Sequence, residues 1–111
     1  MEIREHHHGA VTVLRPMGPL TETDADELKT QMLEVSTKSL GRLVLDASGI
    51  PYVDSRGLEV LLEIADEIAQ TGQALKLCCE NEVLREVLEL TELTTAFEHF
   101  ADVNSAVRSF L

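Results

Sequence analysis

Tryptophan is absent from this chain of 111 residues, and its aromatic side chains, histidine aside, are three Phe and one Tyr. A core of this composition has to be built from Leu, Val, Ile and Ala. The hydrophobic content of 44% and the charged content of 26% are those of a globular protein and argue against a disordered chain. The length suffices for one hydrophobic core, so we expect residues 1–111 to form a single domain.

Positive charge is scarce, because 9 Lys and Arg residues stand against 20 Asp and Glu residues, for a net charge of −11. Binding to nucleic acid or to an anionic membrane surface needs clustered Lys and Arg. The sequence therefore predicts no nucleic-acid partner. A role in transcription would have to run through another protein.

Cysteines and long apolar runs are also few. Cys78 and Cys79 are adjacent, and neighbours on an extended strand point to opposite faces, so we expect two buried free thiols and no disulfide. No apolar run approaches the roughly twenty residues of a membrane helix. These features predict no membrane insertion and a reducing, cytoplasmic location.

Apolar periodicity predicts strands that alternate with helices. Strands are expected at 3–7, 10–14, 42–46, 74–79 and 97–100. Helices are expected from Thr21 or Thr23, from Asp54 or Ser55, after Asn81, and over 103–111. This order, β-β-α-β-α-β-α-(β)-α, predicts an α/β domain with a mixed sheet of four to five strands and helices packed mainly on one face.

One segment of this pattern has the character of a functional loop. Residues 45–58 read LDASGIPYVDSRGL, so an apolar strand ends at Asp46, a turn with Gly49 and Pro51 follows, and Asp54-Ser55 begins a helix. In open α/β sheets, function concentrates in loops at the carboxyl ends of strands. A serine at a helix start also lies near free backbone N–H groups and the positive end of the helix dipole.

The run LDASGIPYVDSRGLEVLLE resembles the signature of STAS domains, D-x-S-G-(apolar)-x-x-(apolar)-D-S-[ST]-G-L followed by an apolar helix. The resemblance continues through Gly18-Pro19-Leu20, through the run VLELTEL at 87–93, and through the terminal segment 105–107. It covers nearly the whole chain, and it implies a STAS-like fold with no residues left over for a second domain.

The resemblance also implies a function. In stand-alone STAS proteins, the serine after the second aspartate is phosphorylated by a partner kinase that is itself the anti-sigma factor. The unphosphorylated form binds this kinase and frees the sigma factor, and a serine phosphatase restores that form. Carried over to this chain, Ser55 is the phosphoacceptor, Asp54 its flanking acid, and Gly57 the residue that lets the partner's backbone approach.

Asp46 and Ser48, from the first half of the signature, join the expected partner-binding residues. The sequence thus predicts an anti-sigma factor antagonist, a monomer or weak dimer without metal or cofactor. It contains no catalytic constellation, so we expect a non-enzyme. Two alternatives share the fold: an accessory subunit of a lipid-transporting ABC complex, and a scaffold component of a stress-sensing assembly.

Two further positions, Arg56 and Val60, lie in the second half of the signature run. Arg56 stands where the family has Ser or Thr, which leaves one acceptor hydroxyl and makes Arg56 available to Asp54, to the phosphate or to the partner. Val60 falls opposite the apolar stripe at 100° per residue, so we expect an exposed side chain on the docking surface. The stripe expected to face the core is Leu58, Leu61, Leu62, Ala65, Ile68 and Ala69.

Simpler interpretations stand beside these. Ser55 also suits a helix N-cap, and Ser48 is either a second acceptor candidate or a turn serine bonded to its own backbone. His6-His7-His8 lacks further ligands at metal-binding spacing and is typical of a solvated strand end. A serine hydrolase that uses Ser55 with His99 would lack the G-x-S-x-G elbow.

Overall fold

The computed structural model describes all 111 residues. The elements run in the order β1 (Glu2–His8), β2 (Val11–Met17), α1 (Glu22–Ser39), β3 (Leu43–Asp46), the 3-10 turn η1 (Ala47–Gly49), α2 (Ser55–Ala69), β4 (Lys76–Cys78), α3 (Glu82–Leu90), η2 (Thr94–Ala96), β5 (Glu98–Phe100) and α4 (Val103–Arg108). The predicted order is confirmed, and the optional last strand is present.

The five strands form one sheet in the order β1-β2-β3-β4-β5. The β1–β2 hairpin is antiparallel, and each later neighbour is parallel to the one before it. A helix therefore connects each parallel pair, as a βαβ unit requires. Every residue of β3 and β4 is buried, which explains why β3 is almost continuously apolar.

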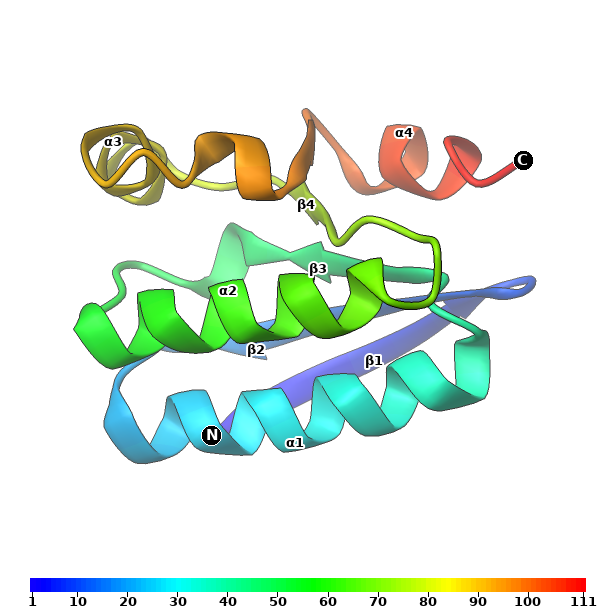
Figure 1. Cartoon of the computed structure of the whole chain (residues 1–111), viewed down its shortest axis with the longest axis horizontal. Coiled ribbons are helices and arrows are strands. Elements are labelled where there is room, and N and C mark those ends of the chain that lie inside the picture. The colour runs from blue at the N-terminus through cyan, green and yellow to red at the C-terminus, as the bar shows by residue number, and fades with distance from the viewer.

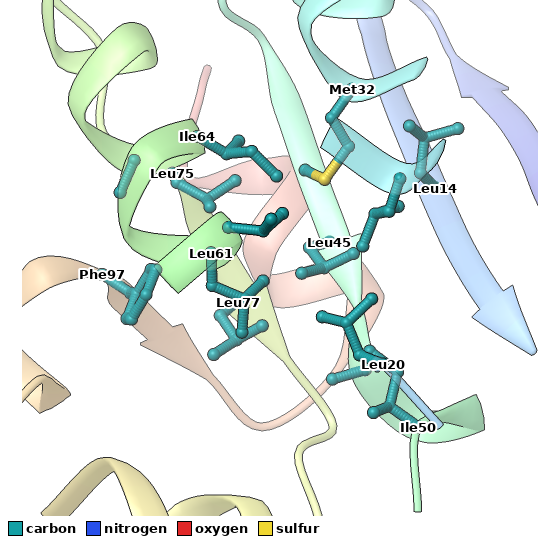
Figure 2. Packing of buried hydrophobic residues seen from close by; sticks show 14 of the residues in the cluster. Leu14, Leu20, Met32, Leu45, Ile50, Leu61, Ile64, Leu75, Leu77 and Phe97 are labelled. Atoms are coloured by element: carbon teal, nitrogen blue, oxygen red, sulfur yellow. The ribbon is translucent and has the colours of Figure 1, made fainter. Parts of the chain in front are cut away.

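In Figure 1, α1 and α2 lie side by side over one face of the sheet. Alternate residues of the central strands belong to a large core between this face and the two helices. Leu14, Leu45 and Leu77 lie on this face, opposite Met32 of α1 and Leu61 of α2, as Figure 2 shows. This cluster contains 20 buried residues, without Trp or Tyr among them. The expected aliphatic core is confirmed.

The other face of the same strands is covered by α4 and carries a smaller cluster. Its buried members are Val11, Val13, Val44, Cys78 and Ala106. The helices therefore pack mainly on one face, as predicted, while the short C-terminal helix covers part of the second face. The helix expected over 103–111 is shorter than predicted, because α4 ends at Arg108 and Leu111 is 98% exposed.

The expected orientation of α2 is also wrong in part. Val60 is fully buried, whereas Ala69 is exposed and Leu58 and Leu62 are only half-buried. The physical reason is that α2 packs against α1 as well as against the sheet, so that its buried arc is wider than one stripe. Val60 lies on the side that faces α1 and joins the large core, so it is not part of an exposed docking surface.

Candidate functional site

Asp54 closes the loop between β3 and α2 and joins the starts of two helices. One carboxylate oxygen accepts the backbone N–H of Gly57 at 2.8 Å, which makes Asp54 the N-cap of α2. The other oxygen accepts the N–H of Glu22, the first residue of α1, at 3.3 Å. A single carboxylate thus satisfies N–H groups at the positive ends of both helix dipoles.

Ser55 is the first residue of α2, and its side chain is exposed. Its hydroxyl makes no hydrogen bond, and the backbone N–H groups of Ser55 and Arg56 have no acceptor in the protein. The capping interpretation of Ser55 is therefore wrong, because Asp54 performs that role. The structure leaves a free hydroxyl beside two free N–H donors.

Gly57 is buried against the chain segment that enters α1. A β-carbon built on Gly57 would overlap the carbonyl oxygen of Leu20. This close approach belongs to a small parallel contact, in which Leu20 bridges to Val53 and the N–H of Asp54 donates to the carbonyl of Leu20 at 3.2 Å. The space that glycine provides here is used by this chain itself.

Arg56 lies at the centre of an ion-pair network between α1 and α2. Its guanidinium contacts Asp26 of α1 at 2.5 Å, and Glu59 and Glu63 of α2 at 2.8 and 3.0 Å. The hydrogen bond to Asp26 is the main cause that raises the pKa of the arginine above its usual value. In this state Arg56 is engaged with these three carboxylates and makes no pair with Asp54.

Glu63 completes the network from the other side. It receives a hydrogen bond from Lys29 of α1 as well as from Arg56. The lysine, followed by the arginine, holds the pKa of Glu63 below its usual range, against the opposing effect of desolvation. These cross-helix pairs flank buried Val60, which fits its place on the α1-facing side of α2.

Asp46 and Ser48 lie at the carboxyl end of β3, in the same connection. The Asp46 carboxylate, in a residue only 8% exposed, accepts the N–H of Ser48 at 3.0 Å and caps η1. The hydroxyl of Ser48 is exposed and makes no hydrogen bond. Asn81 then holds the following stretch, because its amide donates to the carbonyls of Ile50 and Pro51 at 3.3 and 3.1 Å.

The two cysteines do not point to opposite faces as expected. Cys79 follows β4 with a φ of +63°, a left-handed conformation outside the extended strand, and the two thiols and Asp46 approach one another within 4.8 Å. Burial raises the pKa of the Cys78 thiol, and the neighbouring thiol and carboxylates raise it further. Residue pattern alone gave no signal for this left-handed turn, because a non-glycine residue rarely adopts it.

The histidines lie apart from the serine. His6, His7 and His8 are on the exposed strand β1, where His7 bonds Glu5 at 2.9 Å. His99 bonds the carboxylate of Glu80 and the carbonyl of Thr94, both at 2.6 Å. No histidine is hydrogen-bonded to Ser55, so the structure gives no support to the hydrolase interpretation. None of the helices has the length and apolarity needed to cross a bilayer.

The sequence also matches a known protein family. The STAS domain family profile matches residues 2–106. The chain belongs to the STAS domain family. In this chain the sheet order is β1-β2-β3-β4-β5, and an exposed serine follows the Asp54 cap.

Two curated relatives carry antagonist names. BtrV of Bordetella bronchiseptica, designated a candidate anti-sigma factor antagonist, is 30% identical over 80 residues, covering 72% of this chain and 69% of the relative. The anti-sigma F factor antagonist of Paenibacillus polymyxa is 28% identical over 94 residues, covering 84% and 80% of the two chains.

Solved structures share the fold at lower identity. TM1081 of Thermotoga maritima, designated a candidate anti-sigma factor antagonist, superposes with a TM-score of 0.88 at 23% identity, covering 96% of this chain and 92% of that one. The phosphorylated form of SpoIIAA from Bacillus superposes with a TM-score of 0.73 at 14% identity, covering 99% and 100%. The predicted α/β STAS fold is therefore confirmed.

Proposed function

We propose that this chain is an anti-sigma factor antagonist whose binding to an anti-sigma factor serine kinase is switched off by phosphorylation of Ser55. The observation that carries the proposal is the free, exposed hydroxyl of Ser55 at the start of α2, while its neighbour Asp54 makes both helix-capping bonds. The antagonist names of two relatives support the partner class.

The chemistry needs nothing catalytic from this chain. The kinase supplies ATP, a P–O bond forms at the Ser55 Oγ, and the bond between the γ-phosphorus and the β-phosphate oxygen breaks. The hydroxyl proton passes to a base of the kinase. This chain contributes an accessible acceptor, which its structure presents without disrupting any hydrogen bond.

The product would keep the fold. The N–H groups of Ser55 and Arg56 are free to donate hydrogen bonds to phosphate oxygens, and the helix dipole favours negative charge at this position. The phosphate adds about −1.5 to −2 charge at pH 7. The carboxylate of Asp54 adjoins the new charge, and the guanidinium of Arg56 is already shared among three carboxylates, so no side-chain cation is free to pair with the phosphate toward a docked partner. We therefore expect loss of partner binding without unfolding.

The docking surface is expected around the loop that precedes Ser55. Val60 no longer belongs to it, but Tyr52 is 51% exposed and the hydroxyl of Ser48 is free. With Arg56 and Ser55, these side chains provide the mixture of aromatic, hydroxyl and guanidinium groups found at protein interfaces. A serine phosphatase would restore the binding form, and all partners of this cycle act in the cytoplasm.

The test is the affinity for a candidate anti-sigma kinase from the same organism, measured calorimetrically with an ATP analogue that cannot be hydrolysed. Wild type and Ser55→Ala are expected to bind equally. Ser55→Asp and enzymatically phosphorylated wild type are expected to bind at least about 100-fold more weakly, or about 2.7 kcal/mol.

Ser48→Asp is the matched control, because it adds the same charge to an exposed serine of the same connection outside the α2 helix start. We expect a smaller loss of affinity for it than for Ser55→Asp. Circular dichroism on each variant separates loss of binding from unfolding. Equal affinity of the phosphorylated and unmodified proteins would refute the switch, and absence of binding by every form would refute the partner class.

A further inference from the structure

A second group of reactive side chains lies at the carboxyl ends of β3 and β4. These side chains take no part in the proposed phosphorylation of Ser55. Asp46 pairs with Cys78 in the parallel register of these strands, and both side chains point to the α4 face of the sheet. Cys79 follows directly. One carboxylate oxygen and the two sulfurs all lie within 4.8 Å of one another.

The backbone creates this arrangement at one residue. The φ of +63° at Cys79 turns the chain out of the strand, so that its thiol stays beside that of Cys78 instead of pointing to the opposite face. A left-handed conformation is costly for a residue with a β-carbon. Glycine or asparagine would adopt it more readily, so the cysteine here is not explained by backbone preference.

The carboxylate of Asp46 has no positively charged side chain as a partner. Its residue is 8% exposed, it makes no ion pair, and its hydrogen bonds come from the N–H of Ser48 and the thiol of Cys79. The nearest buried cation in the sheet, Lys76, pairs with Glu98 and lies over the rings of Phe100 and Phe110. A buried carboxylate normally has a cationic partner. Asp46 has none in the protein.

We propose that Asp46, Cys78 and Cys79 form a binding site for a zinc ion. Zinc accepts thiolate and carboxylate ligands together, and a tetrahedral ion holds its ligand atoms about 3.3–3.8 Å apart. The three ligand atoms lie within 4.8 Å of one another, so binding requires them to approach by up to about 1–1.5 Å. Harder ions such as Mg²⁺ prefer oxygen ligands only, so the two sulfurs select zinc among the divalent ions.

The binding step balances without an oxidant. Two S–Zn bonds and one O–Zn bond form, and the two thiol protons leave to solvent, so the net charge of the site is −1 both before binding and with the ion bound. The fourth position remains for water or for the carbonyl of Ala101, which already accepts the Cys79 thiol at 3.7 Å. The zinc proposal does not require that Ser55 be phosphorylated.

Bound zinc would fix the connection that leads to Ser55. Asp46 begins η1, and Asn81, two residues after Cys79, holds the carbonyls of Ile50 and Pro51. The ion would therefore link Asp46, at the start of this connection, to Cys78 and Cys79, which precede the Asn81 that holds its middle.

Cobalt(II) is the probe, because a thiolate bound to it produces an ultraviolet charge-transfer absorption that histidine ligands do not. The full chain is titrated anaerobically with cobalt chloride in the presence of a phosphine reductant. We expect saturation at one equivalent, with the absorption lost when zinc is added. Cys79→Ser should lower the charge-transfer intensity by about half, and Asp46→Asn should weaken binding at least tenfold.

The exposed histidines of β1 supply the matched control. The double variant His6→Ala/His8→Ala should keep the charge-transfer absorption, because these side chains lie outside the cluster. Circular dichroism shows whether each variant is folded. Absence of the absorption in folded wild type at millimolar cobalt would overturn the proposal, as would an absorption that Cys79→Ser and Asp46→Asn leave unchanged.

Discussion

The two faces of the sheet are built from the same strands but differ in what covers them. On one face, α1 and α2 enclose a cluster of 20 buried residues, whereas on the other α4 covers a cluster of 5. The large cluster consists of aliphatic side chains with Met32 and Phe97, and the polar residues buried on this side, Thr12 and Ser36, are uncharged. The smaller face also accommodates Asp46, Lys76 and the thiol of Cys78. The difference indicates that stability comes mainly from the first face, and that buried polar chemistry is tolerated on the second.

The largest expected loss of stability comes from a cavity in the larger cluster. Leu45→Ala should lower the free energy of unfolding by about 2–5 kcal/mol, because its site between α1 and α2 cannot collapse. Val44→Ala, one residue earlier and equally buried, should cost about 1.6 kcal/mol for two carbons, since short α4 is able to adjust. Urea unfolding measures both, and equal losses would contradict the ranking of the faces.

Gly57→Ala should have the next largest effect. Alanine favours helix formation over glycine by about 1 kcal/mol, but its β-carbon would overlap the Leu20 carbonyl. We expect a net destabilisation of about 1–3 kcal/mol in urea unfolding. Ser55→Ala, two residues away, is the control and should stay within about 0.5 kcal/mol of wild type. An unchanged or raised stability of Gly57→Ala would show that this contact yields easily.

The two aspartate caps allow a smaller comparison between the faces. Asp54→Ala should cost about 1–2 kcal/mol, the upper part of the usual range for an N-cap, because this carboxylate also bonds Glu22 of α1. Asp102 caps only α4, through the N–H of Ser105 at 2.7 Å, so Asp102→Ala should cost less. Thermal unfolding of the two variants checks the order, and a larger loss for Asp102→Ala would reverse it.

The smallest expected effect concerns pH. The hydrogen bonds from Lys29 and Arg56 lower the pKa of Glu63, so its stabilising contribution is complete above the unfolded pKa and is lost as the pH falls through the folded pKa. In an NMR titration, Lys29→Met should raise the pKa of Glu63 more than Arg56→Gln does. Lys38→Met, at an exposed lysine of α1 that pairs with Glu34, should leave it unchanged. Equal shifts from all three variants would contradict the network.

Much of the fold was predictable from local pattern. Ala25, Leu28, Met32 and Val35 recur at helical spacing and are all buried in α1, because this helix has one apolar side and a solvated acidic one. The start of α2 was also predicted to within one residue. Local signals sufficed here because a cap and an apolar repeat are both properties of neighbouring residues.

Other features depend on contacts that sequence spacing does not reveal. Val60 was expected at the surface but is enclosed because α2 meets α1, a pairing that the pattern of α2 alone cannot show. Gly57 was assigned to a partner, whereas its missing β-carbon accommodates Leu20 of the same chain. The turn at Cys79 likewise depends on a backbone conformation that its residue type disfavours.

Phosphosite mapping tests the central claim most directly. Wild type, Ser55→Ala and Ser48→Ala are each incubated with the anti-sigma kinase and ATP, and intact-mass and fragment-ion spectra locate the phosphate. The account predicts one phosphate on Ser55 in wild type and in Ser48→Ala, and none in Ser55→Ala. A phosphate on Ser48, or an unmodified wild type in the presence of a kinase that phosphorylates another antagonist, would contradict it.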